Sequence, residues 1–460
     1  MKIVQLMARI EGSGVTRYVI ELNKGLKANG HDVEVIYVKA HEKAEMDGGT
    51  QSIPFAVEYD YSDATVKHIN EADLVIINSI MEKKADEKYH NLWMDFVMNK
   101  ITTRKAIVCN DHNVLGFAAY YGPLLHNSEF WLAFDKIITF APKAMVAQKI
   151  CAACGEAEFR KRFVQLILPH NYSEEDKKAW VPANEKLRRV TYLGRHSGFK
   201  DPTRLLRGRD KFYAHNYELE MRGIKRTINV STIPDLLYSF DEQGNRQPSK
   251  ACIMASDKKW REDNGIALDD PMLETPVRQK GWCYVFDAYK REEGMKCVAK
   301  SAFGCDFFHL KTDGCYGDDF EYSVFEIIQM GSIPLLDWNA GNACRMYDEH
   351  TKCLNKTALE MGLGVFIKKD LSNLDEALAQ MDELASNPDK YDELRNKIFD
   401  AFKKNCNAKS IAQKMVDDCF LEGENPCYNE LCALDSTPME DWTVEQKTKT
   451  KPKPESEELF

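Results

Sequence analysis

The chain of 460 residues contains no run of about 18 consecutive apolar residues, so we expect no membrane-spanning helix. It begins with a strand-like segment rather than a charged and then apolar one, so we expect no signal peptide. Its net charge is −10, which argues against general nucleic-acid binding. Its 14 cysteines lack the spacing of a small disulfide or zinc scaffold, which fits free thiols in a reducing compartment. These absences are typical of a globular protein, and the chain length predicts two or three domains.

The charge is unevenly distributed along the chain. Residues 186–226 contain 12 Lys or Arg and 4 Asp or Glu, a balance of +8, whereas residues 422–460 have a balance of −6. The basic stretch is a candidate for binding the phosphates of a nucleotide, of DNA or of both. The alternative is a solvated helix face whose charges pair locally. We expect the acidic end to be a flexible extension.

The first 40 residues have the pattern of a strand, a helix and a second strand. An apolar run over Ile3–Met7 ends at the turn Gly12-Ser13-Gly14, helical spacing of apolar residues follows, and Val33–Val38 has the pattern of the next strand. A glycine turn that opens a helix lets backbone N–H groups approach a phosphate or a sugar. Gly14 and Val15 are therefore candidate ligand contacts, although any α/β domain with a tight turn shows the same pattern.

Strand-like and helical segments alternate along the rest of the chain, which predicts an α/β protein with two doubly wound parallel sheets. Residues 234–277 are polar and irregular, and we expect loops or an insertion there. The expected units are an N-terminal Rossmann-like domain over residues 1–172, a linker over 173–185, a second Rossmann-like domain over 186–405, a helix over 406–422 that crosses back onto the first domain, and an acidic, partly disordered tail over 423–460.

Charged residues follow strands in both expected domains. Arg195 comes directly after the first strand of the second domain, and Lys200 lies five residues later, so both cations could reach a pyrophosphate. The alternative is two surface cations. In the first domain Asp111 and His112 follow a strand, where side chains face the cleft of a doubly wound sheet. Asp111 could act as a base or stabilise positive charge on a sugar, and His112 could assist or only cap a turn.

Taken in order, the motifs resemble those of the phage DNA glycosyltransferases, the family of the T-even DNA α-glucosyltransferases. That family has the GT-B fold, in which two Rossmann-like domains face a cleft and helices close the C-terminus. The matching segments are Met7–Arg9, Glu11–Thr16, Asn29–His31, Ile76–Ser79, Asp111–Leu115, Gly194 and Arg195 with Lys200, Met221–Gly223, Ser301–Gly304 and Glu321–Glu326.

The resemblance implies that a UDP-sugar donates its sugar to a hydroxylated cytosine in double-stranded DNA, with retention at the anomeric carbon. It implies that Arg195 and Lys200 contact the diphosphate, so no metal or other cofactor is required. The chain also has no Asp-x-Asp, the motif of the metal-dependent donor site in the other main glycosyltransferase fold. Further implied roles are catalysis by Glu21 and Asp111 with His112, and donor binding by Gly14, Val15, Met221, Gly223, Glu321, Tyr322, Ser323 and the ribose-binding Glu326.

The chain departs from this family at two places. Asn110 stands where the family has a histidine, a change that could favour a pentose such as arabinose over glucose. The acid that precedes the ribose glutamate falls at Asp318, with Glu321 as the alternative.

We expect Arg204, Arg207 and Arg209 of the basic stretch to contact DNA. We also expect a monomer that acts in the cytoplasm of the infected bacterium, without a membrane. The competing hypotheses are a GT-B enzyme with a glycan, lipid or small-molecule acceptor, and a non-catalytic DNA-binding protein. The second of these leaves the combination of Arg195, Lys200 and Glu326 unexplained.

Overall fold

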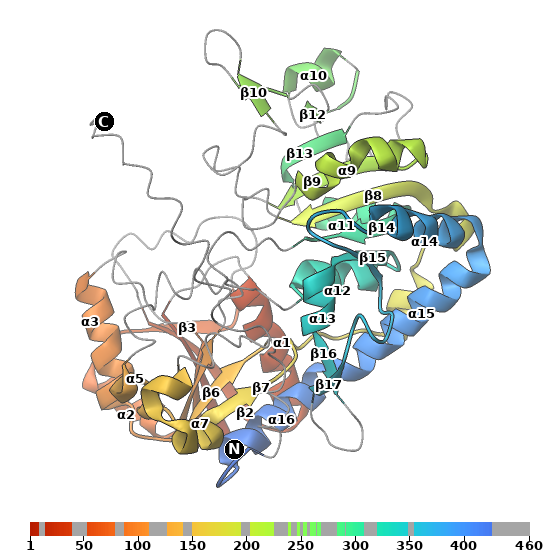
Figure 1. The fold of residues 1–460 in the computed structure, drawn as a ribbon. Helices are drawn as coiled ribbons and strands as arrows, with labels where there is room; N and C mark the ends of the chain where they lie inside the picture. Colours follow the sequence, from red (N-terminus) through yellow and green to blue (C-terminus); the bar gives the residue numbers. More distant parts are fainter. Residues whose placement is uncertain are drawn as a thin grey trace.

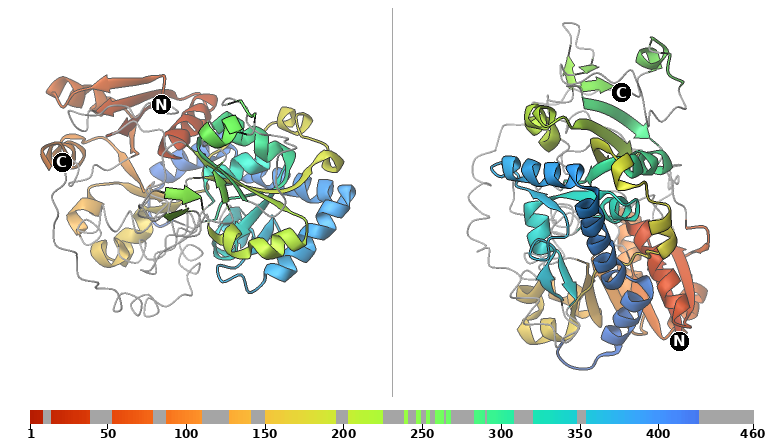
Figure 2. Two further views of the ribbon diagram at one scale, coloured as in Figure 1. Left: turned by 90° about the horizontal axis from the view of Figure 1, so that it is seen from above. Right: turned by 90° about the vertical axis from the view of Figure 1, so that its right-hand side faces the viewer.

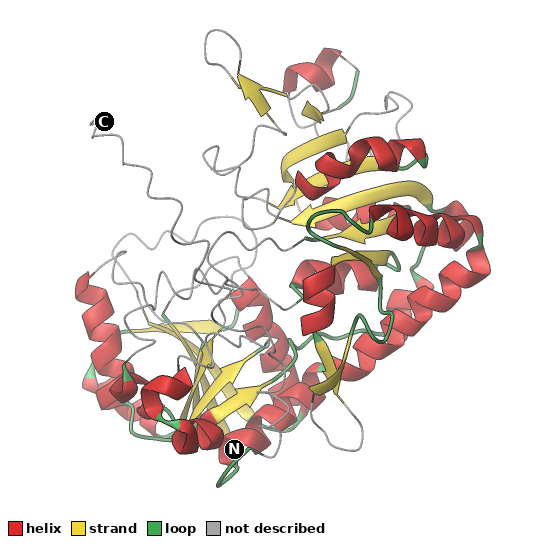
Figure 3. Ribbon diagram, viewed as in Figure 1, coloured by secondary structure: helices red, strands yellow, loops and turns green. Residues whose placement is uncertain are grey.

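The computed structural model describes residues 1–8, 14–38, 53–78, 87–109, 127–140, 150–194, 203–224, 238–240, 246–248, 252–254, 258–263, 265–267, 283–289, 291–307, 320–347 and 354–425. Two α/β lobes follow one another along the chain (Figure 1). Helices lie on both sides of the strands in each lobe (Figure 3). The acidic tail expected over 423–460 lies outside the described residues from position 426 onward.

The N-terminal sheet has seven parallel strands in the order β3-β2-β1-β4-β5-β6-β7. Its central strands are almost continuously apolar and are buried on both faces, as parallel strands covered by helices usually are. The strands are β1 (Lys2–Met7), β2 (Asp32–Val38), β3 (Ala56–Tyr59), β4 (Leu74–Ile77), β5 (Lys105–Cys109), β6 (Lys136–Thr139) and β7 (Phe163–Gln165). The helices are α1 (Gly14–Ala28), α2 (Asp63–Asn70), α3 (Glu87–Asp95), the π-helix η1 (Phe96–Lys100), α5 (Ser128–Leu132) and α7 (Glu156–Arg162).

The second sheet also has seven parallel strands, in the order β12-β13-β9-β8-β14-β15-β18. Its strands are β8 (Leu187–Gly194), β9 (Glu218–Ile224), β12 (Cys252–Met254), β13 (Cys283–Tyr289), β14 (Ser301–Cys305), β15 (Ile333–Asp337) and β18 (Val365–Ile367). Its helices are α9 (Thr203–Ala214), α10 (Lys258–Asp263), α11 (Arg291–Lys300), α12 (Tyr322–Gln329), α13 (Trp338–Ala343), α14 (Leu374–Ser386) and α15 (Pro388–Asn405). Two antiparallel pairs stand apart from it: β10 (Tyr238–Phe240) with β11 (Arg246–Pro248), and β16 (Arg345–Tyr347) with β17 (Leu354–Thr357).

The expectation that residues 234–277 form only loops or an insertion is wrong in one respect. β12 lies within that stretch and pairs with β13 at the edge of the second sheet. The remaining described part forms the β10–β11 pair and α10, which lie at the end of this lobe (Figure 1). The strand has only three residues, and the apolar run around it, residues 251–255, is short and lies in an otherwise polar stretch, which makes it a weak pattern for a strand.

The expected linker residues pack against the second lobe. They contain α8 (Glu174–Lys178) and a 3-10 turn, η2 (Ala183–Glu185). The indole Nε1 of Trp180 donates a hydrogen bond to the carbonyl of Gln329 at 2.9 Å. A Cβ at Gly331, whose φ is +68°, would lie 2.5 Å from the Trp180 ring, so only glycine allows this approach.

The last described helix, α16 (Ala408–Phe420), leaves the second lobe and lies along α1 of the first (Figures 1 and 2). The two backbones approach closely at Gly25, where a Cβ would lie 2.1 Å from the carbonyl oxygen of Ala408. The amide of Asn29 adds a 2.8 Å hydrogen bond to the carbonyl of Lys409. The absence of a side chain at Gly25 therefore sets the distance between α1 and α16.

We predict that Gly25→Ala destabilises the protein by about 1–3 kcal/mol, because the added methyl group forces the two helices apart. Denaturant unfolding measures the change. Ala28→Ser, at an exposed position on the same helix, is the control and should leave the midpoint unchanged. A wild-type midpoint for Gly25→Ala would show that the α1–α16 contact is not tight.

Candidate functional site

Each sheet has one position where neighbouring strands lead to helices on opposite faces. In the first sheet this switch point lies between β1 and β4, and in the second it lies between β8 and β14. Ligands of open α/β sheets bind outside the carboxyl ends of the strands at such points. The described residues at these strand ends include Ala8 and Asn78 in the first sheet and Gly194 and Asp306 in the second.

The two carboxyl edges are brought together by α1 and α12, which lie next to each other (Figure 1). α1 begins after β1, and α12 is the next described helix after β14. Burial raises the pKa of Tyr322, the first residue of α12, well above its usual value, and the nearby carboxylate of Glu21 in α1 raises it further. Tyr322 also donates a 2.9 Å hydrogen bond to the carbonyl of Pro169, which lies between the lobes.

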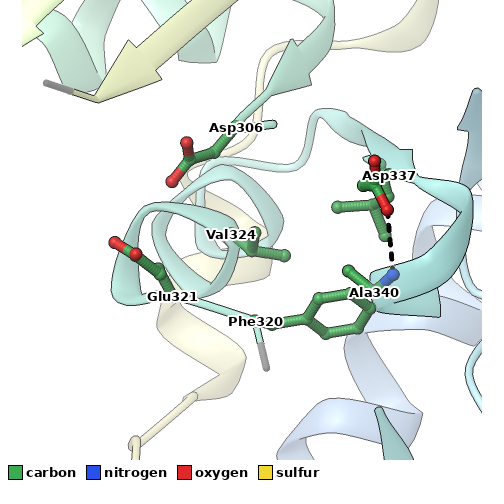
Figure 4. A pocket seen from close by; sticks show the side chains of 7 residues that line it. Asp306, Phe320, Glu321, Val324, Asp337 and Ala340 are labelled. Atoms are coloured by element: carbon green, nitrogen blue, oxygen red, sulfur yellow. Dashed lines mark hydrogen bonds between the residues drawn. The ribbon is translucent and has the colours of Figure 1, made fainter. Parts of the chain in front are cut away.

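A small pocket lies at the carboxyl edge of the second sheet (Figure 4). The carboxylates of Asp306 and Glu321 point toward the same side of it, next to the start of α12. The Ser323 hydroxyl donates a hydrogen bond to Asp306, and Asp337 accepts one from the Ala340 amide at 3.0 Å. The lining residues are Asp306, Phe320, Glu321, Val324, Leu336, Asp337 and Ala340.

The start of α12 contains several of the residues predicted to contact the donor. Glu321 is the N-cap residue, and its side chain makes no capping hydrogen bond to the helix. The first N–H groups of a helix are not used within the helix, so the amides of Tyr322 and Ser323 are placed to meet an anion. Glu326 lies one turn further along α12 and is buried. These four predicted donor residues therefore share one short helix.

Glu21 is buried in α1 at 1% exposure. Its Oε1 pairs with Arg17 and with Lys24, both at 3.0 Å, and its Oε2 accepts a 3.1 Å hydrogen bond from the amide of Asn171. Two cations and an amide thus hold this carboxylate between α1 and the residues that join the lobes. Its predicted catalytic role stays a prediction.

Other predicted donor residues lie at the starts and ends of elements. Gly14 is the first residue of α1, and Val15 is half-buried beside it. The Met221 side chain is fully buried and packs in the core, so a donor contact of this residue would have to come from its backbone, and the contact stays a prediction. Gly223 follows it near the carboxyl end of β9.

Several predicted residues fall outside the described part of the chain: Asp111, His112, Arg195, Lys200 and Asp318. The structure instead draws attention to Asp306 and Asp337, which the sequence analysis missed. Both are acidic residues at the end of a buried strand, and that position was the signal that could have identified them.

The predicted DNA-binding arginines lie on α9, and the structure contradicts one of them. The side chain of Arg204 is 1% exposed and forms a buried ion pair with Asp337, so it does not face solvent. Arg207 is exposed and donates to the carbonyl of Lys369 at 3.2 Å. Arg209 is half-buried and donates to the carbonyl of Leu206 at 3.0 Å. The roles of Arg207 and Arg209 stay predictions.

Much of the basic stretch is paired inside the second lobe. Lys186 donates to the carbonyl of Ala299 at 2.8 Å, and burial lowers its pKa well below its usual value. Arg189 pairs with Glu218 at 2.9 Å, and Arg222 pairs with Glu220 at 2.6 Å. These residues pair locally, but Arg189 and Arg222 lie in β8 and β9 and are buried, so the expectation of a solvated helix face is wrong for them.

Within the described ranges no group of three or more His, Cys, Asp or Glu side chains has the arrangement of a metal site. No helix in that same part of the chain is long and apolar enough to cross a membrane.

Comparison with known proteins identifies similar chains. A family model described as DNA alpha-glucosyltransferase matches residues 13–124. The DNA alpha-glucosyltransferase of Enterobacteria phage T4 is 23% identical over 420 residues, which cover 87% of this chain and 95% of the phage protein. The resemblance to this family drawn from the motifs is thereby confirmed.

Solved structures share the fold. An alpha-glucosyltransferase in complex with UDP and a DNA 13-mer containing an HMU base matches with a TM-score of 0.67 at 18% identity, covering 92% of this chain and all of that one. A trehalose-6-phosphate synthase matches with a TM-score of 0.52 at 10% identity, covering 92% of this chain and all of the synthase. The predicted GT-B fold is confirmed.

We predict that Asp306→Ala costs about 1–3 kcal/mol of stability, because the Ser323 hydroxyl then loses its acceptor in a buried position. Asp306→Asn keeps a side-chain carbonyl and should lose less. Thermal unfolding of the two variants gives the comparison. Equal losses would show that the negative charge, rather than the hydrogen bond, stabilises this position.

Proposed function

We propose that this protein transfers a sugar from a UDP-sugar to the hydroxyl of hydroxymethylated cytosine in phage double-stranded DNA, with retention at the anomeric carbon. The observation that carries the proposal is the similarity to the T4 DNA alpha-glucosyltransferase over 95% of that protein. A match of this extent includes both sheets and the connection between them, whereas a match to the second sheet alone would support only a shared donor site. The attached sugar would protect phage DNA from nucleases in the cytoplasm of the infected host, where we expect the protein to act as a monomer.

The donor would bind at the carboxyl edge of the second sheet. The amides at the start of α12 would meet the diphosphate, and Glu326 would accept hydrogen bonds from the ribose hydroxyls. Arg195 and Lys200 would offset the charge that grows on the departing UDP, which is the work of a metal ion in other enzymes. The pocket beside Asp306 and Glu321 adds carboxylate acceptors of the kind that bind sugar hydroxyls.

The acceptor would be activated from the first sheet. Asp111 would take the proton of the cytosine hydroxyl, or stabilise positive charge on the sugar, and His112 would assist it. Glu21, held between Arg17, Lys24 and Asn171, would present negative charge beside α12. Because the reacting oxygen must meet the anomeric carbon between two facing sheet edges, the target base would flip out of the duplex.

The identity of the sugar would depend on the first domain. Asn110 replaces a histidine of the related phage enzymes, and an amide there changes the hydrogen bonds available to a hydroxymethyl group. We therefore propose glucose or a pentose such as arabinose.

The function is tested by mass spectrometry of nucleosides after the protein is incubated with hydroxymethylcytosine DNA and a panel of UDP-sugars. A glycosylated nucleoside is expected with one sugar, and EDTA should leave the yield unchanged. Preferred transfer to free oligosaccharides in parallel reactions would favour the glycan or small-molecule alternative. Loss of all product in EDTA would refute the metal-free mechanism.

Asp111→Ala should abolish transfer while UDP binding stays close to wild type, because Asp111 serves the acceptor. Asp111→Asn, which keeps the size and removes the charge, separates loss of the base from loss of packing. Calorimetry with UDP and a transfer assay give the two readings. Weaker UDP binding with normal transfer would assign Asp111 to the donor instead.

Affinity for DNA should fall with salt, because phosphate contacts release counterions. Arg207→Glu and Arg209→Glu should each weaken DNA binding and lower the slope of log affinity against log salt by about 1, without changing UDP affinity. The control is Lys397→Glu, the same charge change at an exposed position on α15. An equal effect of the control would mean that net charge, rather than these arginines, governs binding.

A further inference from the structure

Arg204 lies in the first turn of α9, and its guanidinium is buried among the ends of three strands. It donates to the carboxylate of Asp337, the last residue of β15, and to the carbonyl of Ile367, the last residue of β18, at 3.3 Å. Its Cζ lies 4.7 Å from the ring centroid of Phe307, two residues beyond β14. One side chain therefore ties α9 to the carboxyl edge of the second sheet.

The partners of Arg204 belong to the pocket beside α12. Asp337 lines that pocket together with Asp306 and Glu321, and it also accepts a hydrogen bond from the backbone amide of Ala340 in the first turn of α13. Leaving a buried carboxylate without its cation is costly, so Asp337 is expected to change position when Arg204 is removed. The orientation of this pocket wall thus depends on a helix that is distant from it in sequence.

The same helix follows the sequence segment that carries the predicted diphosphate contacts. Arg204 is four residues after Lys200 and nine after Arg195. At the other end of that segment, a Cβ at Gly194 would lie 3.2 Å from Oδ1 of Asp306. Of the two described ends, Gly194 therefore lies close to Asp306, and α9 is tied to Asp337 by the Arg204 ion pair.

We propose that Arg204 is a positioning residue for the nucleotide-sugar site and does not contact DNA. It holds the start of α9 and the carboxylate of Asp337 in the arrangement that the donor requires. This inference rests on the proposed function, because it assumes that the pocket edge binds a UDP-sugar. It assigns Arg204 and Arg207, three residues apart on one helix, to different substrates.

The experiment compares Arg204→Met with Arg207→Met in the full-length protein. UDP affinity is measured by calorimetry, KM and kcat by transfer assay, and DNA affinity by titration at fixed salt. Arg204→Met should weaken UDP binding and raise the KM for the UDP-sugar by more than about tenfold, the effect of losing a buried charge-assisted hydrogen bond. Its DNA affinity should stay within about twofold of wild type, and Arg207→Met should show the opposite pattern.

Two further variants keep the result decisive if Arg204→Met folds poorly. Arg204→Lys keeps the charge and should stay close to wild type, whereas Asp337→Asn removes the ion pair without changing Arg204 and should itself raise the KM for the UDP-sugar above the wild-type value. In Arg204→Met/Asp337→Asn the two losses should not add, because both residues act through one interaction. A structural role alone would lower the melting temperature without this selective rise in KM.

Normal UDP affinity in any folded variant that lacks the Arg204–Asp337 pair would overturn the inference. Loss of DNA affinity with intact UDP binding in Arg204→Met would return Arg204 to the DNA-binding set. If the wild-type protein fails to bind UDP, the proposed function falls, and this inference falls with it.

Discussion

The return of α16 to α1 is the constraint on which the arrangement of the two lobes depends. Gly25 permits backbone contact, and Arg104 and Asn425 add hydrogen bonds of 2.8 and 3.0 Å to the carbonyls of Cys419 and Phe163. The preceding helix, α15, packs against the second sheet. Its Arg395 donates a hydrogen bond to the carbonyl of Val181, in the segment that joins the lobes, at 2.9 Å. The chain therefore crosses between the lobes twice. The backbone amide of His170, in the first connecting segment, donates a hydrogen bond to the carbonyl of Cys406, in the second, at 2.7 Å. This bond joins the two connections, so any rotation of one lobe relative to the other has to pivot there.

This pivot lies next to the candidate site. The residues on either side of His170 are engaged with both lobes: Pro169 accepts the Tyr322 hydroxyl, and Asn171 donates to Glu21. A change in the position of α12 when its N–H groups bind an anion would therefore be transmitted to the carboxylate on α1 through three consecutive residues. The start of α12 and the carboxylate of Glu21 are thus linked by covalent chain and hydrogen bonds, and under the proposed function this link would join the donor side of the site to the acceptor side.

Most of the architecture could be predicted from the sequence, because central parallel strands are nearly continuous apolar runs, as in Leu74–Ile77. The edge strand Ala56–Tyr59 was not predicted because two of its four residues are exposed. The strand Ser301–Cys305 is harder to predict because it contains Gly304, which is unfavourable in strands; in the structure a Cβ there would lie 2.7 Å from Ile327. At the candidate site, the sequence pattern correctly placed Tyr322 and Ser323 at the start of a helix, but it could not show that Arg204 faces the core. Its spacing from Gly208 and Phe212 on the buried face of α9 was the available signal.

The internal pairing of cations also bears on how a protein with a net charge of −10 could use DNA as its acceptor. Positive charges that pair with Glu218, Glu220 and Asp337 support the second lobe and contribute little to attraction between the protein and a phosphate backbone. Binding to unmodified DNA would then be weak, because non-specific affinity arises almost entirely from phosphate contacts. Recognition would have to come from the modified base itself once it enters the space between the two sheet edges. An enzyme that must leave each product site and find the next one gains turnover when the modified base, and not the phosphate backbone, supplies most of the recognition. Weak backbone binding shortens its residence on DNA that carries no target.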